Sequence, residues 1–65
     1  IKNKNMNLQE LKIYAINQGT KYPSKKEEIN NLVDICATNI EDGSSIEVEI
    51  ASCVNDIQGV ILGTK

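Results

Sequence analysis

The sequence contains no histidine and no arginine. Histidine is the commonest general base in enzymes and the commonest metal ligand, so its absence removes both roles at once. Arginine supplies the planar, two-pronged contact that proteins use for phosphate and carboxylate groups, and lysine does not replace it. The sequence also has no glycine-rich phosphate loop and no nucleophile beside a base. We therefore expect a protein that is not an enzyme, with no catalytic residues, no metal ligands and no cofactor.

Phenylalanine and tryptophan are also missing, and tyrosine occurs only twice. The core must then be built from aliphatic side chains, in a chain of 65 residues that makes one domain at most. A chain of this size buries only about 60% of its unfolded surface, so its core is thin. We expect self-association as a homo-oligomer, covering the large aliphatic residues that remain once a core has formed. These residues are Ile13, Ile16, Val48, Ile61 and Leu62.

No apolar run approaches the roughly 20 residues that a membrane-spanning helix needs. The first residues are polar and are not followed by an apolar segment of the signal-peptide type. We therefore predict a soluble, cytoplasmic protein without membrane contact, with residues 1–6 as a disordered lead-in and 7–65 as a single small helical domain. The abundance of Asn, Ile and Lys, whose codons are rich in A and T, favours a bacterial or phage gene.

Two apolar runs mirror each other across the segment 41–45, which has the composition of a turn. Both follow the spacing of three and four residues that is typical of one face of a helix. Folding the chain at the turn brings the members of the two runs opposite each other in pairs. The pairs are Ile40 with Ile50, Cys36 with Cys53, Val33 with Ile57 and Ile29 with Val60. This pattern predicts an antiparallel helical hairpin.

Capping signals predict three helices, at about 7–18, 24–40 and 45–62, and hence an all-α fold, a small three-helix bundle. Each predicted helix begins with a short polar residue that is followed by Glu three residues later, the pattern of a capping box. The pairs are Asn7 with Glu10, Ser24 with Glu27 and Ser44 with Glu47. Gly19 is expected to end the first helix in the left-handed conformation, and Gly63 is expected to end the third.

The last third of the chain also allows an α+β alternative, in which two helices are followed by a β-hairpin. Residues 45–50 alternate between polar and apolar types and are rich in β-branched side chains, which favours a strand. Asn55 and Asp56 could then form the turn of the hairpin. The helical spacing persists over the whole segment, whereas the alternation covers only its beginning, so we favour the helix.

Cys36 and Cys53 are the only cysteines. Their equal distance from the turn predicts that they face each other, either as a disulfide or as a buried thiol pair. Free cysteine is among the most buried residue types and often acts as a small apolar side chain. Two thiolates without a histidine do not complete a zinc site, so metal binding is not expected.

Charge is distributed unevenly along the chain. Residues 1–32 hold six Lys against three Glu, whereas residues 33–65 hold six acids against one Lys. Four acids cluster around the predicted turn and are our candidates for contact with a protein partner: Glu41, Asp42, Glu47 and Glu49. A solvated turn that keeps the protein soluble is the alternative interpretation.

These observations predict a non-catalytic protein–protein interaction module or small regulator, which binds a protein partner or a second copy of itself. An acidic inhibitor that imitates nucleic acid and binds a basic protein is the alternative. Nucleic-acid binding is less favoured, because the third predicted helix contains acidic residues and no Lys or Arg. It would depend on lysines in the first half: Lys2, Lys4, Lys21, Lys25 and Lys26. No motif gives a resemblance to a known family.

Overall fold

The computed structural model describes residues 6–63, and its first helix is α1, Leu8–Lys21. Asn7 caps this helix in the way that the sequence predicts. Its Oδ1 accepts a hydrogen bond from the Glu10 backbone N–H at 2.8 Å, and the Asn7 backbone N–H donates to Glu10 Oε1 at 3.0 Å. The capping box is therefore complete, and it satisfies two backbone donors that a helix start otherwise leaves to water.

The predicted end of α1 at Gly19 is wrong. The helix continues to Lys21, and its last turn closes when the Tyr22 N–H donates to the Gln18 carbonyl at 2.8 Å. Gly19 is buried where α1 meets the start of the next helix: a Cβ there would lie 3.2 Å from Lys26 Cγ. The glycine thus permits a close approach between two helices, which a local sequence pattern cannot distinguish from a helix end.

The predicted capping box of Ser24 and Glu27 is also wrong. Ser24 lies within a short 3-10 helix, η1 (Pro23–Lys25), and the helix α2, Lys26–Glu41, begins only after it. Proline has a backbone angle suited to a first helical turn, so the chain is already turning at Pro23. The Lys25 N–H then donates to the Tyr22 carbonyl at 2.8 Å. Ser24 consequently does not occupy the extended cap position that the prediction required.

A tight turn leads from α2 to α3, Ile46–Leu62. Gly43 holds a positive φ of 108°, and Ser45, not Ser44, is the cap, accepting from the Val48 N–H at 3.5 Å. Gly63 ends α3 in the left-handed conformation with φ 78°, as predicted. The alternative β-hairpin is wrong: residues 46–62 form one helix, and the described part of the chain contains no strand.

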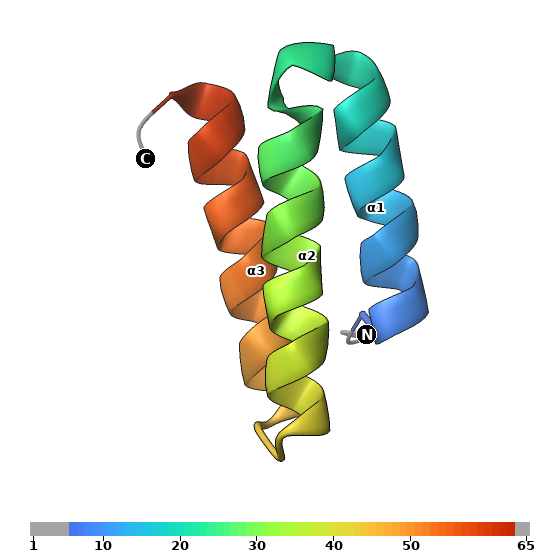
Figure 1. Cartoon of the computed structure of the whole chain (residues 1–65), viewed down its shortest axis with the longest axis vertical. Helices are drawn as coiled ribbons and strands as arrows, with labels where there is room; N and C mark the ends of the chain where they lie inside the picture. Colours follow the sequence, from blue (N-terminus) through green and yellow to red (C-terminus); the bar gives the residue numbers. More distant parts are fainter. Residues whose placement is uncertain (1–5, 64–65) are drawn as a thin grey trace, which may run out of the picture.

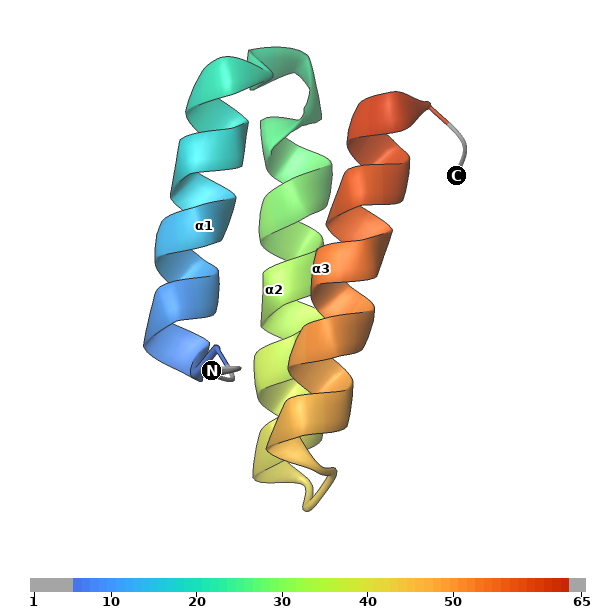
Figure 2. The same cartoon turned by 180° about the vertical axis from the view of Figure 1, so that it is seen from behind.

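Helix α2 lies between the other two helices (Figures 1 and 2). Both α1 and α3 pack mainly on α2 and have fewer contacts with each other. The all-α fold, a small three-helix bundle with an antiparallel hairpin, is therefore confirmed. None of the helices between residues 6 and 63 has both the length and the apolar content that crossing a bilayer requires. Met6, which the sequence assigned to the lead-in, packs against the core, whereas residues 1–5 lie outside the described part.

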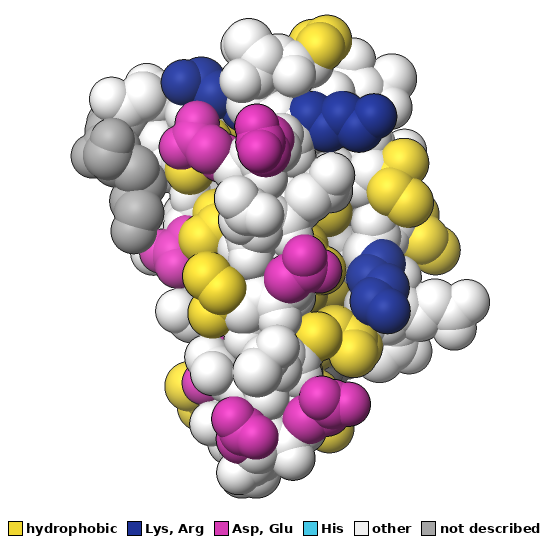
Figure 3. Space-filling model, viewed as in Figure 1, with side chains coloured by type: hydrophobic (Ala, Val, Ile, Leu, Met, Phe, Trp, Pro, Cys, Tyr) yellow, Lys and Arg dark blue, Asp and Glu magenta, His cyan; other side chains and the backbone are white. Residues whose placement is uncertain are grey.

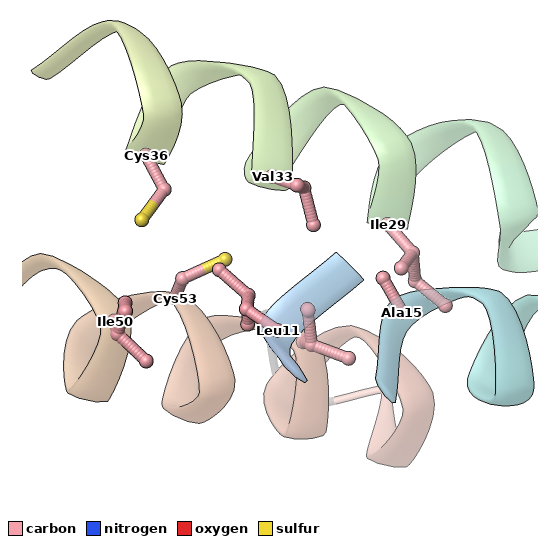
Figure 4. Close-up of a cluster of buried hydrophobic side chains, with 8 residues drawn as sticks. Leu11, Ala15, Ile29, Val33, Cys36, Ile50 and Cys53 are labelled. Carbon is pink, nitrogen blue, oxygen red and sulfur yellow. The ribbon is translucent and has the colours of Figure 1, made fainter. Parts of the chain in front are cut away.

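One continuous core joins the three helices, and most of its side chains are shown in Figure 4. Leu11 and Ala15 of α1 meet the face of α2 that also receives α3. The predicted apolar positions of the hairpin supply the remainder of the core. Its fully buried or nearly buried members are Leu11, Ala15, Ile29, Val33, Cys36, Ile50, Cys53 and Ile57. The buried members of the core are thus all small or aliphatic, and the aromatic ring of Tyr14 packs against them while only partly buried.

We predict that Ile57→Ala lowers the free energy of unfolding by about 2–4 kcal/mol, because it leaves a cavity at a position with no exposure. Ile13→Ala is the matched control: Ile13 is 53% exposed, so the same truncation should change stability by less than about 0.5 kcal/mol. Urea titrations of both variants measure the difference. Equal losses of stability in the two variants would contradict the complete burial of the Ile57 side chain in the core.

Candidate functional site

The four acids predicted as a partner site lie around the end of the helical hairpin. Glu41 is the last residue of α2, Asp42 follows as its cap, and Glu47 and Glu49 belong to the first turn of α3. Glu41, Asp42 and Glu47 are exposed, and Glu49 is half-buried. Residues two positions apart in a helix point roughly 200° away from each other, so Glu47 and Glu49 leave α3 on nearly opposite sides. The four acids consequently do not form a single patch.

Glu49 has a structural role in the hairpin. Its Oε1 accepts a hydrogen bond from Asn39 Nδ2 at 3.0 Å, which connects α3 to α2. Sequence reasoning did not identify Asn39, because a polar residue ten positions away gives no local signal. On the other side of α3, Glu47 lines an open groove of about 390 Å³ together with Met6, Ile50 and Val54. The other three acids are not part of the lining of this groove.

A different set of acids lies along the outward face of α2. Acidic side chains follow this helix from one end to the other (Figure 3). Glu27, Asp34 and Glu41 recur every seven residues, which places them on one side of the helix, with Asp42 at its end. All four are exposed. We call Glu27, Asp34, Glu41 and Asp42 the α2 acidic stripe.

The sevenfold spacing of the α2 acidic stripe was visible in the sequence, but the prediction had grouped acids by their closeness along the chain. Basic residues accompany only the upper half of the stripe. Lys26 is adjacent to Glu27, and Lys12 of α1 lines the same groove as Asp34. From Asp34 onward, α2 contains no basic residue. The negative charge is therefore least compensated toward the hairpin end.

Glu41 and Asp42 lie where a negative charge disfavours the helix. The carboxyl end of a helix carries a partial negative charge, and α2 has no basic residue in its last turn to offset it. Glu27 lies in the first turn, where the same charge is favourable. The negative charges at the lower end of the stripe therefore destabilise the end of α2, so helix stability is not the reason that acids occupy these positions.

We predict that Glu41→Lys raises the free energy of unfolding by about 0.3–1 kcal/mol at low salt, because it places a favourable charge at the end of α2. Glu27→Lys makes the same chemical change at the opposite end and should lower stability by a similar amount. Urea titrations at low and high salt measure both effects, which screening should weaken. If the two variants shift in the same direction, the dipole argument does not apply to α2.

Cys36 and Cys53 form the second candidate feature. Both thiols are free and buried, and their sulfur atoms lie in the space between α2 and α3 (Figure 4). Burial raises the pKa of Cys53 to about 12, and the charges of Asp56 and Glu49 contribute to this increase. Burial and the charge of Glu49 also raise the pKa of Cys36, whereas the hydrogen bond from Cys53 opposes that rise. Both groups are therefore neutral at physiological pH.

The described residues offer little else for chemistry. No group of three or more Cys, Asp and Glu side chains within residues 6–63 is positioned to hold a metal ion. The hollows between the helices are open, and the one beside the two thiols has a volume of only about 110 Å³. Comparisons with family models, with curated proteins and with solved structures found no match. The arguments about function therefore depend on the chain itself.

We predict that stability decreases from about pH 9 toward pH 12 and that Cys53 is one cause. Its pKa is about 12 in the folded protein but 9.0 in an ordinary thiol, so the unfolded chain loses this proton first. Stability from this group is complete below pH 9 and is lost as the pH rises. Cys53→Ala is the control, because it removes this thiol and leaves the other side chains unchanged. Urea midpoints from pH 8 to pH 11 should decline less steeply in this variant; parallel declines would contradict the prediction.

Proposed function

We propose that this domain is a non-catalytic interaction module whose α2 acidic stripe binds a basic surface on a protein partner. The supporting observation is a one-sided row of exposed carboxylates along a whole helix, least compensated at its lower end. Glu41 and Asp42 add to this argument because helix formation disfavours their charge. A contact with a basic partner would supply the compensating charge that the domain itself lacks at this end.

The spacing of the stripe favours a protein partner over a surface adapted to nucleic acid. Seven residues of helix correspond to about 10.5 Å, so Glu27, Asp34 and Glu41 extend over about 21 Å. Duplex DNA carries one charge per roughly 1.7 Å of axis, a far denser array. The stripe therefore resembles the polar face of one helix more than a phosphate backbone. It matches a helix or strand with widely spaced lysines or arginines, and the nucleic-acid mimic remains the weaker alternative.

The stripe can be tested with two variants of equal charge. The first variant neutralises the three stripe residues that share one side of α2, with Glu27→Gln, Asp34→Asn and Glu41→Gln. The control variant also removes three charges, but from α1 and α3: Glu10→Gln, Glu47→Gln and Asp56→Asn. Glutamine preserves the capping box at the first of these positions. Glu49 stays in both, because its bond to Asn39 supports the hairpin.

We predict that proteins retained by the immobilised wild type, in an extract of its native host, are also retained by the control variant but lost with the stripe variant. A purified partner should then associate with the stripe variant about tenfold more slowly at low salt, because complementary charge mainly raises association rates. Added salt should reduce the difference. Equal loss in both variants would indicate dependence on net charge alone, and loss only in the control variant would move the contact to another face.

Self-association is the second candidate, and a separate observation supports it. Ile13 and Ile16 lie one turn apart on the outward side of α1 and are 53% and 64% exposed. Neighbouring exposed aliphatic residues are unusual on small monomers and favour contact with another protein surface. Sedimentation of the wild type and of Ile16→Ser across a wide concentration range tests this candidate, and it is independent of the two charge variants.

A further inference from the structure

The thiol pair has a geometry that its role as core packing does not require. Cys36 comes from α2 and Cys53 from α3, and both sulfur atoms lie in the space between these two helices. Two small apolar side chains would fill a similar space but could not form a covalent bond between the helices. The pair also lies on the interface that holds the hairpin together, so a bond between them would connect two helices directly.

A small hollow gives access to this pair from the surface between α2 and α3. Its volume is about 110 Å³, and its lining includes both cysteines, Asn39 and Ser52. Two carboxylates, those of Glu49 and Asp56, belong to the same lining, so the hollow presents negative charge. Such a hollow accepts a small neutral molecule. It excludes oxidants of peptide size, and it repels anionic ones.

We propose that hydrogen peroxide converts Cys36 and Cys53 slowly into a disulfide that locks α2 to α3. Peroxide is small and uncharged, so it fits both the size and the charge of the hollow. The proposal is separate from the function of the α2 acidic stripe, which lies on the outward face of the same helix.

The reaction balances with peroxide as the only oxidant. The Cys36 sulfur, whose pKa the neighbouring Cys53 thiol lowers against the effect of burial, attacks one peroxide oxygen as a thiolate. The O–O bond breaks, and the released hydroxide takes up the proton that left Cys36, which gives water and a sulfenic acid on Cys36. The Cys53 sulfur then attacks the Cys36 sulfur, and the S–O bond breaks. The second hydroxide leaves with the Cys53 proton as water, so two thiols and one peroxide give one disulfide and two waters.

The expected consequence is a more stable hairpin. The new bond would close a loop running from Cys36 through the turn to Cys53 and would restrict the unfolded chain. For a loop of this length, we expect the equilibrium constant for unfolding to fall about a hundredfold. Because burial keeps both thiols protonated, the reaction should be slow at neutral pH and faster at mildly alkaline pH.

The test treats the full chain with hydrogen peroxide under native conditions and follows it by intact mass and by urea titration. We expect the loss of two hydrogens, a higher urea midpoint, and reversal of both by a thiol reductant. Oxidised glutathione, which is large and anionic, should leave the folded protein unmodified but should react in urea. Cys36→Ser and Cys53→Ser are the controls and should show no increase of the midpoint with peroxide.

Other results would overturn the proposal. A gain of oxygen atoms without loss of hydrogen would mean that the two sulfur atoms do not join. A dimer that disappears on reduction would mean that the bond forms between chains. Equally rapid reaction of the folded protein with glutathione disulfide and with peroxide would exclude the selective hollow. If a serine variant fails to fold, the wild type before and after reduction provides the same comparison.

Discussion

The structure depends on one face of α2, where Ile29, Val33 and Cys36 are covered by two helices at once. In a chain without Phe or Trp, burial must come mainly from close packing of small and aliphatic side chains. Ala15 and Gly19 permit this on α1, and Gly19 leaves space for the stem of Lys26. Because α1 and α3 meet each other less, their position is set mainly by what each buries on α2.

The central position of α2 also explains where the charge lies. Only Ile29, Val33 and Cys36 of α2 are buried, and its ionised side chains lie on the surface that remains in contact with water. These side chains are nearly all acids, so this surface carries charge of one sign over most of its length. Burial of the core face thus decides which side of α2 carries the charged residues. Burial does not decide the sign of these charges, so the single sign of the α2 acidic stripe supports an argument about binding.

The thiol pair follows from the same packing. Cysteine is small, so two of them allow α2 and α3 to approach closely at one level of the hairpin. Their burial keeps them neutral, and Glu49 raises the pKa of both thiols while its oxygen holds Asn39 of α2. One carboxylate therefore stabilises the hairpin and suppresses thiol ionisation. This coupling between an interhelical contact and cysteine chemistry could not be anticipated from either residue alone.

The sequence by itself determined the helical hairpin, because the apolar spacing on both sides of the turn is a property of consecutive residues. It also determined the capping box of Asn7 and the end at Gly63, which depend on neighbours within one turn. Tertiary structure decided the features that need two helices. The close approach at Gly19 and the bond from Asn39 to Glu49 are contacts between elements, and the separation of Glu47 from Glu49 depends on rotation about α3. The sevenfold spacing of the acids along α2 is a property of the sequence, but the tertiary structure decided that this row is exposed, because burial of one side of the helix defines which side is left to water.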